Sequence, residues 1–337
     1  MATITRPLTT GQRAADLNVL VRKQRSLWQD AWYRLRRNRA AMAGVGVVAV
    51  TVLIALSAGW DLYPFDQRVV HPILAPYDPS NPFTADGKQA PVLADPVWAG
   101  TKFVDSRYLL GTDNLGRDIL SRLIYSARVS LIVGFIPVSI VFLVGGSVGM
   151  VSGYVGKWVD QVLMRITDII YAFPDLLFLL ILVATLRNTD FGNLMGGLVL
   201  IFVGLAIVGW VGMARLWRGQ VLSLKEKEFV EAARAVGASP MRIMVRHLFP
   251  NALAPAIVAV SFGIPGAMLA EAALSFLGIG VKPPTPTWGV MINEGFLVFS
   301  TSAWPVMLPA ICIALVMLSF TFLGDGLRDA LDPRMKI

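Results

Sequence analysis

Long stretches of apolar residues alternate with short polar segments along this chain, and the pattern predicts membrane-spanning helices. A helix needs about 20 mostly apolar residues to cross the hydrocarbon core of a bilayer. Six stretches of this kind occur, at 41–59, 129–155, 166–186, 191–213, 254–280 and 303–323. Four of them contain no charged residue, whereas the third carries Asp168 and Asp175 and the fifth carries Glu271. We therefore expect an all-α integral membrane protein with six transmembrane helices.

Composition supports this prediction and excludes several chemistries. Of the 337 residues, 55% are hydrophobic and 15% are charged, against roughly 25% charged in an average soluble protein. The first apolar stretch follows a basic segment that is too long for a signal peptide, so we expect an uncleaved anchor. The chain has a single cysteine, Cys312, so no disulfide within the chain is expected. Its two histidines, His71 and His247, are far apart in sequence and do not predict a metal site. The chain lacks the GxxxxGK[ST] phosphate-binding loop, so we expect no ATPase site and no cofactor.

The positions of the basic residues predict the orientation in the membrane. The net charge is +8, and 21 of the 30 Lys and Arg fall in the tail 1–40, the turn 152–165, the loop 214–251 and the end 326–337. Basic residues favour cytoplasmic loops, so both termini are expected in the cytoplasm. The positive charge then needs no nucleic-acid partner.

The segment 60–127 is expected outside as a small insert, either irregular or β-containing. It holds eight Asp against six basic residues and is rich in proline. Apolar positions at helical spacing predict that 111–128 forms an amphipathic helix in the outer interface, capped by Asp113 or Asn114. A plain solvated connector is the alternative. A five-helix core would follow over 128–325.

Glycines in the second apolar stretch predict close packing against a neighbouring helix. Gly145, Gly149 and Gly153 recur every four residues and so form a groove on one helix face. This pattern indicates a helix bundle without indicating any particular chemistry.

The cytoplasmic loop 214–251 has the strongest local signals. Residues 226–236 are good helix formers, Gly237 is suited to end that helix, and Ser239 and Pro240 are suited to cap and begin the next. We expect a short helix-turn-helix that exposes Ala232, Ala233 and Ala235, a shape suited to insertion into a partner's cleft. One alternative is a solvated loop with ordinary helices. Another is a DNA-binding helix-turn-helix, but the two flanking spans would tether such a motif to the membrane.

This loop resembles a known signature. Glu231-Ala232-Ala233, Gly237 and the following His247-Leu248-Phe249-Pro250 are similar to the EAA motif of ABC importer permeases, although His247 and Phe249 stand where that motif has Ile and Leu. Further segments resemble the second (C-type) permease of the peptide/nickel importers. They are Arg36–Ala40, Gly111–Asp118, Glu271–Gly278, Pro283–Gly289 and Leu323–Arg334.

The resemblance implies a fold, a coupling element and partners. The fold would be the type I ABC importer permease core. The coupling element, which docks on an ATPase subunit, would be Glu231, Ala232, Ala233, Gly237, Ala238, Ser239 and Pro240. The implied partners are a second homologous permease, two ATPase subunits that bind ATP and Mg²⁺, and an extracytoplasmic solute-binding protein. The expected location is the cytoplasmic (inner) membrane, in contact with lipid.

Polar residues within the apolar stretches are candidates for the transport pathway. Asp175 and Glu271 are the pathway candidates, although either is equally suited to a structural role. Asp168 is expected to pair with Arg165, three residues before it. The stiff loop 281–302 offers Pro284, Pro286 and Trp288 as candidate contacts with the receptor or the outer vestibule.

Two other functions are compatible with parts of the sequence. An ion-coupled secondary transporter acting alone would use Asp168, Asp175 and Glu271, but the repeated broken helices common in such folds are not evident. A membrane enzyme has no paired acids, metal cluster or nucleophile elbow to support it. The cargo stays open among peptides, nickel, glutathione and oligosaccharides.

Overall fold

The computed structural model describes residues 27–58, 74–80, 92–99 and 106–331. Expectations for most of the basic tail, for parts of the insert and for the last six residues lie outside this range. The described residues are mainly helical, and they contain no strand beyond one isolated β-bridge between Thr112 and Asp118. The described parts of the insert are irregular, with one short 3₁₀ helix at Val97–Ala99.

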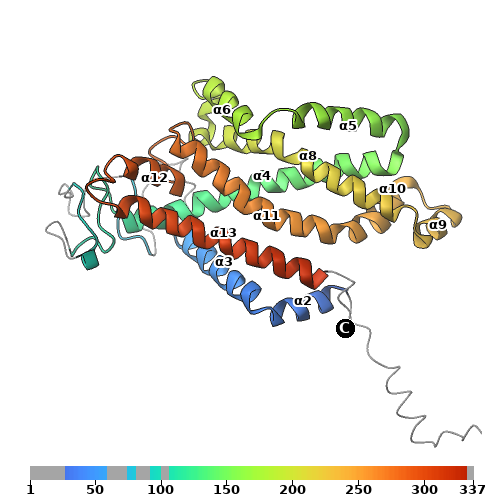
Figure 1. Cartoon of the computed structure of the whole chain (residues 1–337), viewed down its shortest axis with the longest axis horizontal. Helices are drawn as coiled ribbons and strands as arrows, with labels where there is room; N and C mark the ends of the chain where they lie inside the picture. The colour runs from blue at the N-terminus through green and yellow to red at the C-terminus, as the bar shows by residue number, and fades with distance from the viewer. Residues whose placement is uncertain (1–26, 59–73, 81–91, 100–105, 332–337) are drawn as a thin grey trace, which may run out of the picture.

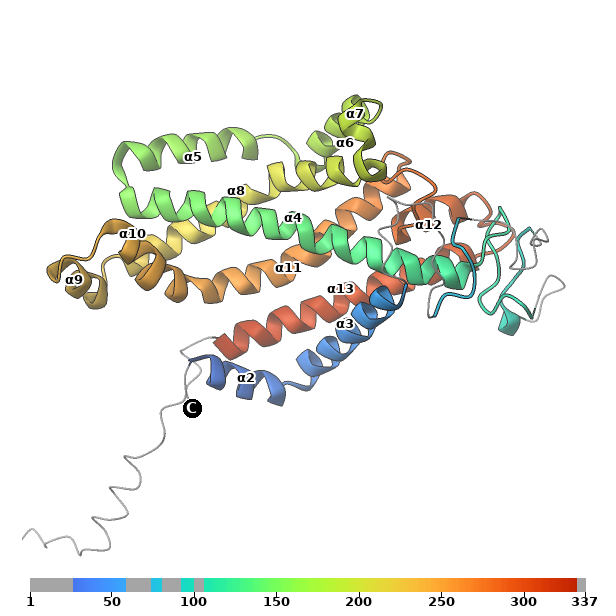
Figure 2. The ribbon, with the colours of Figure 1, turned by 180° about the vertical axis from the view of Figure 1, so that it is seen from behind.

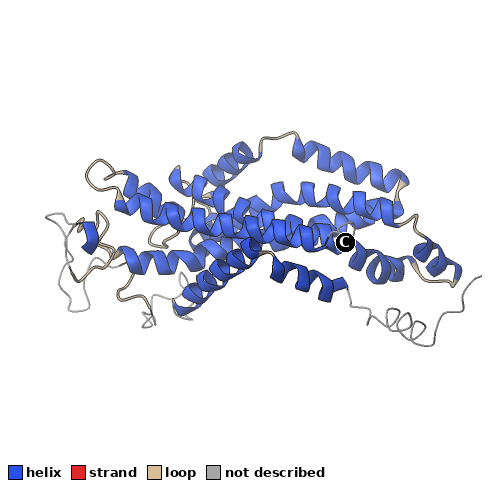
Figure 3. Ribbon diagram, turned by 60° about the horizontal axis from the view of Figure 1, so that its bottom comes forward, coloured by secondary structure: helices blue, strands red, loops and turns tan. Residues whose placement is uncertain are grey.

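Long apolar helices run lengthwise through the molecule (Figure 1). They are α3 (Arg39–Ser57), α4 (Ile119–Val155), α8 (Leu198–Leu224), α11 (Phe249–Phe276) and α13 (Trp304–Leu331). Shorter helices join them: α2 (Leu27–Arg37), α5 (Lys157–Tyr171), α6 (Asp175–Leu186), α7 (Asp190–Asn193), η2 (Leu194–Gly197), α9 (Glu228–Ala235), α10 (Pro240–Arg242), η3 (Ile243–Leu248) and α12 (Trp288–Phe296). Figure 3 shows the all-helical character of the described residues.

Five helical segments of the described residues are long and apolar enough to cross a membrane, and six are if α5 and α6 together make one crossing. The expected third span, 166–186, is broken, because α5 and α6 meet at an angle of 77°. Pro174 explains the break: it has no N–H to donate, and its ring disfavours helical backbone at Phe173. The other five spans occur near their expected places: α3 has the expected length but starts two residues earlier, and the other four helical segments are longer than expected.

The glycine groove of α4 packs against α8, as expected. A Cβ built on Gly149 would lie 2.2 Å from the carbonyl oxygen of Ala214, and one built on Gly145 would lie 2.6 Å from that of Trp210. On Gly153 it would lie 2.9 Å from the Cβ of Val221. The absence of side chains therefore allows the two backbones to approach closely.

The start of α4 differs from the expected interfacial helix. Residues 119–128 are helical, but they are the first turns of α4 itself, and Ile119, Leu123 and Ala127 are buried in the main core. The cap is Asp118, whose Oδ2 accepts a hydrogen bond from the Ser121 N–H at 2.8 Å, and not Asp113 or Asn114. The apolar stripe that suggested a membrane surface faces other parts of the protein.

The two ends of the bundle carry different structures. Figure 2 places α9 and α10 at one end and α12 at the opposite end, beside the described parts of the insert. At the α9 end of the molecule, α2 lies along the last turns of α13, where Ala31, Leu35, Ala41 and Ala330 form a small buried cluster. The candidate functional residues therefore lie in three regions: the α9 end of the bundle, the α12 end, and the helices between them.

Candidate functional site

The helix-turn-helix predicted for the 214–251 loop is present as α9, a turn and α10. Gly237 has a φ of +81°, a left-handed conformation that costs glycine little. Its N–H donates to the Arg234 carbonyl at 2.9 Å, and the Ala238 N–H donates to the Ala233 carbonyl at 3.0 Å, which together form a Schellman motif. Ser239 then caps α10, with Pro240 at its first position. Both capping predictions are confirmed.

The outward side of this turn is an exposed apolar surface. Phe229 is 39% exposed, Val236 83% and Met241 65%. Ala232 and Gly237 lie among them and are also exposed. We call these five residues the coupling surface. Of the other expected coupling residues, Glu231, Ser239 and Pro240 are exposed and Ala238 is half-buried.

The inward side of α9 is packed, and here one expectation is wrong. Ala233 was expected to be exposed, but it is 7% exposed because it faces the same way as Val230. Both side chains pack in a cluster with Val221, Ile243 and Leu248. Ala233 therefore holds α9 in place instead of offering a contact to a partner.

A continuous helix connects the turn of the coupling surface to the membrane part of the chain. The helix that starts at Pro240 continues without a break through one π-helical stretch, Ile243–Leu248, to Phe276. These 37 residues span about 55 Å. Near the loop, the ring of Trp217 on α8 stacks on Phe249 of α11 with centroids 5.3 Å apart. Through Val230 and Ala233, α9 packs against both α8 and the helical stretch that leads into α11.

A cavity of about 340 Å³ lies between the helices that carry the loop. Its walls come from α4, α6, α8 and α11, and four glycines, Gly209, Gly212, Gly263 and Gly266, contribute to them. Asp175, the first residue of α6, is the charged residue in the lining. The break before α6 positions this carboxylate at the cavity.

Glu271 has a different environment from Asp175. It is 1% exposed and is not part of the cavity lining. Its Oε1 accepts hydrogen bonds from Ser275 Oγ at 2.6 Å and from Thr287 Oγ1 at 2.8 Å. This geometry joins α11 to the loop before α12 and is that of a structural acid.

Two carboxylates of α5 hold it against α8. Asp168 pairs with Arg215 at 2.7 Å, so the expected pair with Arg165 is wrong. Asp160, which the sequence analysis did not single out, accepts hydrogen bonds from Nε and from a terminal nitrogen of Arg218, each at 2.6 Å. Helical spacing favours a partner on the same helix, but the neighbouring helix supplies a better-placed guanidinium in both cases.

The loop before α12 does not expose all three residues that were predicted to contact a receptor or the outer vestibule. Pro284 is exposed, but Pro286 and Trp288 are buried. The Trp288 indole N–H donates to the Leu123 carbonyl at 3.3 Å, and its ring, 2% exposed, packs in the main core. Trp288 thus fixes α12 to α4 and has no outward surface to offer.

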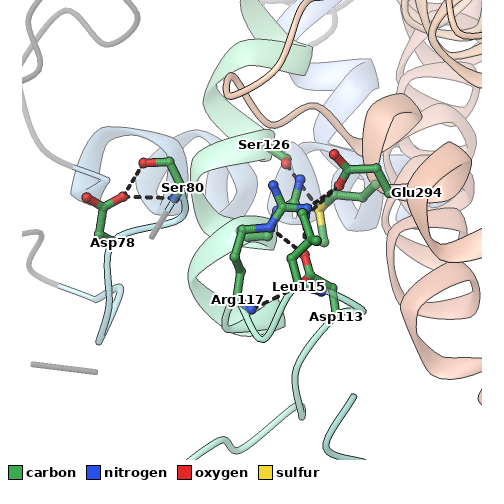
Figure 4. Close-up of polar contacts among 9 residues, drawn as sticks. Asp78, Ser80, Asp113, Leu115, Arg117, Ser126 and Glu294 are labelled. Atoms are coloured by element: carbon green, nitrogen blue, oxygen red, sulfur yellow. Dashed lines mark hydrogen bonds and ion pairs between the residues drawn. The ribbon is translucent and has the colours of Figure 1, made fainter. Parts of the chain in front are cut away.

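A group of four charges, three of them buried and Glu294 half-buried, links the start of α4 to α12 (Figure 4). Asp113 accepts from Arg117 Nε at 2.7 Å and also pairs with Arg122. Glu294 of α12 lies 2.6 Å from a nitrogen of each arginine. The two acids neutralise the two arginines, and we call this group the outer ion cluster. Arg117 belongs to the Gly111–Asp118 segment, whereas no sequence signal indicated Glu294.

Asp118, next to this cluster, is also buried. Burial raises the pKa of its carboxyl above the ordinary value, while the hydrogen bonds from the Ser121 hydroxyl and N–H act in the opposite direction. The Ser121 hydroxyl in turn accepts from the Tyr77 N–H at 3.0 Å. The cap of α4 thereby attaches the insert to the bundle.

Comparison of folds identifies the class of protein. The chain superposes on a solved structure titled as inward facing conformations of the MetNI methionine ABC transporter, with a TM-score of 0.52, 19% identity, and 63% of this chain and 96% of that chain covered. The fold is therefore that of a type I ABC importer permease. The exposed turn on a rigid helix is consistent with this class.

The sequence comparisons establish the family. Residues 145–337 match the family described as binding-protein-dependent transport system inner membrane component, and residues 26–91 match the N-terminal TM domain of oligopeptide transport permease C. The chain belongs to this family of ABC importer permeases, whose ATP hydrolysis is performed by separate subunits. It is a multi-pass inner-membrane protein.

Curated relatives cover almost the whole chain. A dipeptide transport system permease protein, DppC, of Bacillus subtilis is 39% identical over 327 residues, covering 96% of this chain and 91% of the relative. An oligopeptide transport system permease protein, OppC, of the same organism is 34% identical over 323 residues, covering 96% and 95%. A glutathione transport system permease protein, GsiD, of Escherichia coli is 36% identical over 313 residues, covering 93% and 92%.

Proposed function

We propose that this chain is the C-type permease of an ATP-driven importer for peptides or chemically similar small solutes. The names of its relatives support the cargo class. The observation that carries the coupling mechanism is the exposed coupling surface on α9 and its turn, which leads directly into a helix that is unbroken from Pro240 to Phe276. The proposed partners are a second homologous permease, two ATPase subunits and an extracytoplasmic solute-binding protein.

Coupling would begin at α9. Phe229, Val236 and Met241 would bury their apolar side chains in a cleft of an ATPase subunit, where ATP and Mg²⁺ bind. Closure of the ATPase subunits would move α9, and the packed residues Val230 and Ala233 would carry that movement to α8 and α11. Both helices line the cavity, so its walls would shift relative to α4 and α6.

The pathway would pass the cavity at Asp175. The lining of the cavity is mainly apolar, and its glycines leave room beside the helices. Such a lining would suit peptides whose side chains differ in size and chemistry. Asp175 keeps its place as a pathway candidate, while the hydrogen bonds of Glu271 favour a structural role. Pro284 remains a candidate for contact with the receptor.

The proposed orientation places both termini and α9 in the cytoplasm. The basic residues of the sequence favour this side for the tail, for the 214–251 loop and for the end of the chain. The outer ion cluster and the insert would then face the receptor.

The test is ATP-driven uptake by the reconstituted complex with a Val236→Asp permease. Val236 is 83% exposed, so the change should not disturb folding, but it places a charge in the proposed apolar contact. We expect uptake of a labelled dipeptide to fall at least tenfold, with loss of ATPase subunits from the purified complex. Ser223→Asp, an exposed position at the end of α8, is the matched control and should transport normally.

Two results would oppose the proposal. Normal uptake by the Val236→Asp complex would remove the coupling role of α9. Uptake by this chain alone, abolished by an ionophore and indifferent to ATP, would favour the ion-coupled alternative.

A further inference from the structure

The face of α2 that points away from the bundle carries aromatic and basic side chains together. Ala31 and Leu35 point inward and pack with Ala330 of α13. Trp32 and Tyr33 are 49% and 43% exposed on the outward side. Two large aromatic rings thus lie outside the packed cluster, on a helix that is fixed to the protein by its other face.

The arginines of this face are stacked on those rings. The Arg36 guanidinium carbon lies 4.6 Å from the centroid of the Trp32 ring, and that of Arg37 lies 4.5 Å from the centroid of Tyr33. Each ring precedes its arginine by one helical turn, which places the two side chains side by side. Stacking fixes the plane of a guanidinium and leaves its N–H edge available to an anion.

No acid compensates these two charges within the described residues. Neither Arg36 nor Arg37 forms an ion pair there, and both side chains are exposed. Asp30 is the acidic residue of α2 itself, and Asp325 and Asp329 belong to α13, the helix on which α2 packs. The outward face of α2 is therefore locally cationic.

The position of α2 along the chain places this face at the membrane surface. Asn38 caps α3, and after Arg39 the helix has no charged residue through Ser57. Arg36 and Arg37 are the last two residues of α2, and Asn38 alone separates α2 from α3. Because α3 enters the hydrocarbon at this point, Arg36 and Arg37 stand at the level of the lipid headgroups.

We propose that Trp32, Tyr33, Arg36 and Arg37 form a binding surface for the headgroups of anionic phospholipids. The stacked guanidinium groups would bind the lipid phosphate, and the rings would lie at the boundary of headgroup and acyl chain, where aromatic residues are favoured. The surface is separate from the coupling surface, since α2 lies beside α13 and not beside α9 (Figure 2). The proposed function is used here only to assign the cytoplasmic leaflet.

The site has a mechanical consequence for the permease. α2 packs on the last turns of α13, and a Cβ built on Gly326 would lie only 2.3 Å from the Cβ of Ala41. The three helices α2, α3 and α13 are thus closely packed at this end. A lipid held by α2 would fix the end of α13 relative to the membrane plane.

The test is lipid retention by the intact importer complex, measured by native mass spectrometry. The complex is incubated with micelles that contain equal amounts of phosphatidylglycerol and phosphatidylcholine, and the retained lipids are counted. We expect wild type to prefer phosphatidylglycerol, and R36Q/R37Q to lose that preference by roughly fivefold for each arginine removed. W32A, which keeps both charges but removes one stacking ring, should show a smaller loss. The measured quantity is the number of retained lipids, so the result does not depend on whether the complex imports peptides.

The matched control is K157Q/R165Q, which removes two exposed basic residues of α5 that have no ring stacked on them. It should retain phosphatidylglycerol as wild type does. An equal loss in this control, or full retention by R36Q/R37Q or by W32A, would overturn the proposal. So would loss of ATPase subunits from R36Q/R37Q with unchanged lipid retention, because α2 would then be a protein contact.

Discussion

The close packing of α4 on α8 leads to a sharp prediction for Gly149. Replacing it with alanine places a Cβ 2.2 Å from the Ala214 carbonyl oxygen and 2.7 Å from the Cβ of Trp217. Real Cβ atoms essentially never come within 3.0 Å of such neighbours. The two helices must therefore separate by about 1 Å at this level, since the obstructing oxygen belongs to the backbone.

The size of the effect follows from two opposing contributions. Overpacking a well-packed interior costs about 1–3 kcal/mol, and contact with a backbone atom favours the upper end of this range. Alanine in place of glycine within a helix returns about 1 kcal/mol. We expect Gly149→Ala to lower the free energy of unfolding by about 2 kcal/mol, which for a chain of 337 residues corresponds to a fall in Tm of about 3 °C.

The assay is thermal unfolding of the purified complex in detergent, with Gly219→Ala as the control. Gly219 lies on α8 with no neighbour within 4 Å of its built Cβ. This variant gains the same helix propensity without the clash, so its Tm should equal or exceed that of wild type. Equal Tm values for the two variants would refute the argument that α4 and α8 are in backbone contact at Gly149.

Three further predictions concern the carboxylates. Glu294→Gln leaves the buried arginines of the outer ion cluster with one acid in place of two, so Tm should fall by an amount equivalent to about 2 kcal/mol. Asp190→Asn, at an exposed position, is the control. An unchanged Tm for Glu294→Gln would contradict a structural role of this carboxylate. Glu271→Gln keeps an oxygen that can accept from both hydroxyls, so uptake should stay within about twofold of wild type, and abolished uptake in a complex of normal Tm would instead assign Glu271 to the pathway. Asp175→Asn should lower peptide uptake at least fivefold with normal recovery of ATPase subunits, and normal uptake would remove Asp175 from the pathway.

Local signals predicted individual turns well because they depend on neighbouring residues alone. Gly237 ends α9 with a left-handed backbone, and Ser239 and Pro240 begin α10, as expected from their chemistry. The break before Asp175 also follows from Pro174, although the angle of 77° does not. The glycine spacing of α4 predicted a groove, but the identification of α8 as its occupant needed the structure.

Predictions that depended on which surface faces the protein were less accurate. Ala233 was predicted to be exposed and Trp288 to contact the receptor or the outer vestibule, and both side chains are buried. A short apolar stripe has the same pattern whether it faces lipid, a partner or the same chain, which is why the pattern of 111–128 predicted an interfacial helix. The partner of an ion pair likewise depends on the tertiary structure, since Asp168 pairs with Arg215 of α8 and not with Arg165 of its own helix.

The sequence by itself determined that this protein spans the membrane with helices, which of its turns are sharp, and which family it belongs to. These properties follow from composition, from local backbone preferences and from motifs whose order is preserved along the chain. The tertiary structure alone decided that Glu294 neutralises two arginines that lie 172 and 177 positions earlier in the chain. It also decided that Asp175 lines a cavity while Glu271 is enclosed by hydroxyl groups. The reason is physical: the role of a charged side chain depends on the groups that surround it in space, and those groups come from distant parts of the chain.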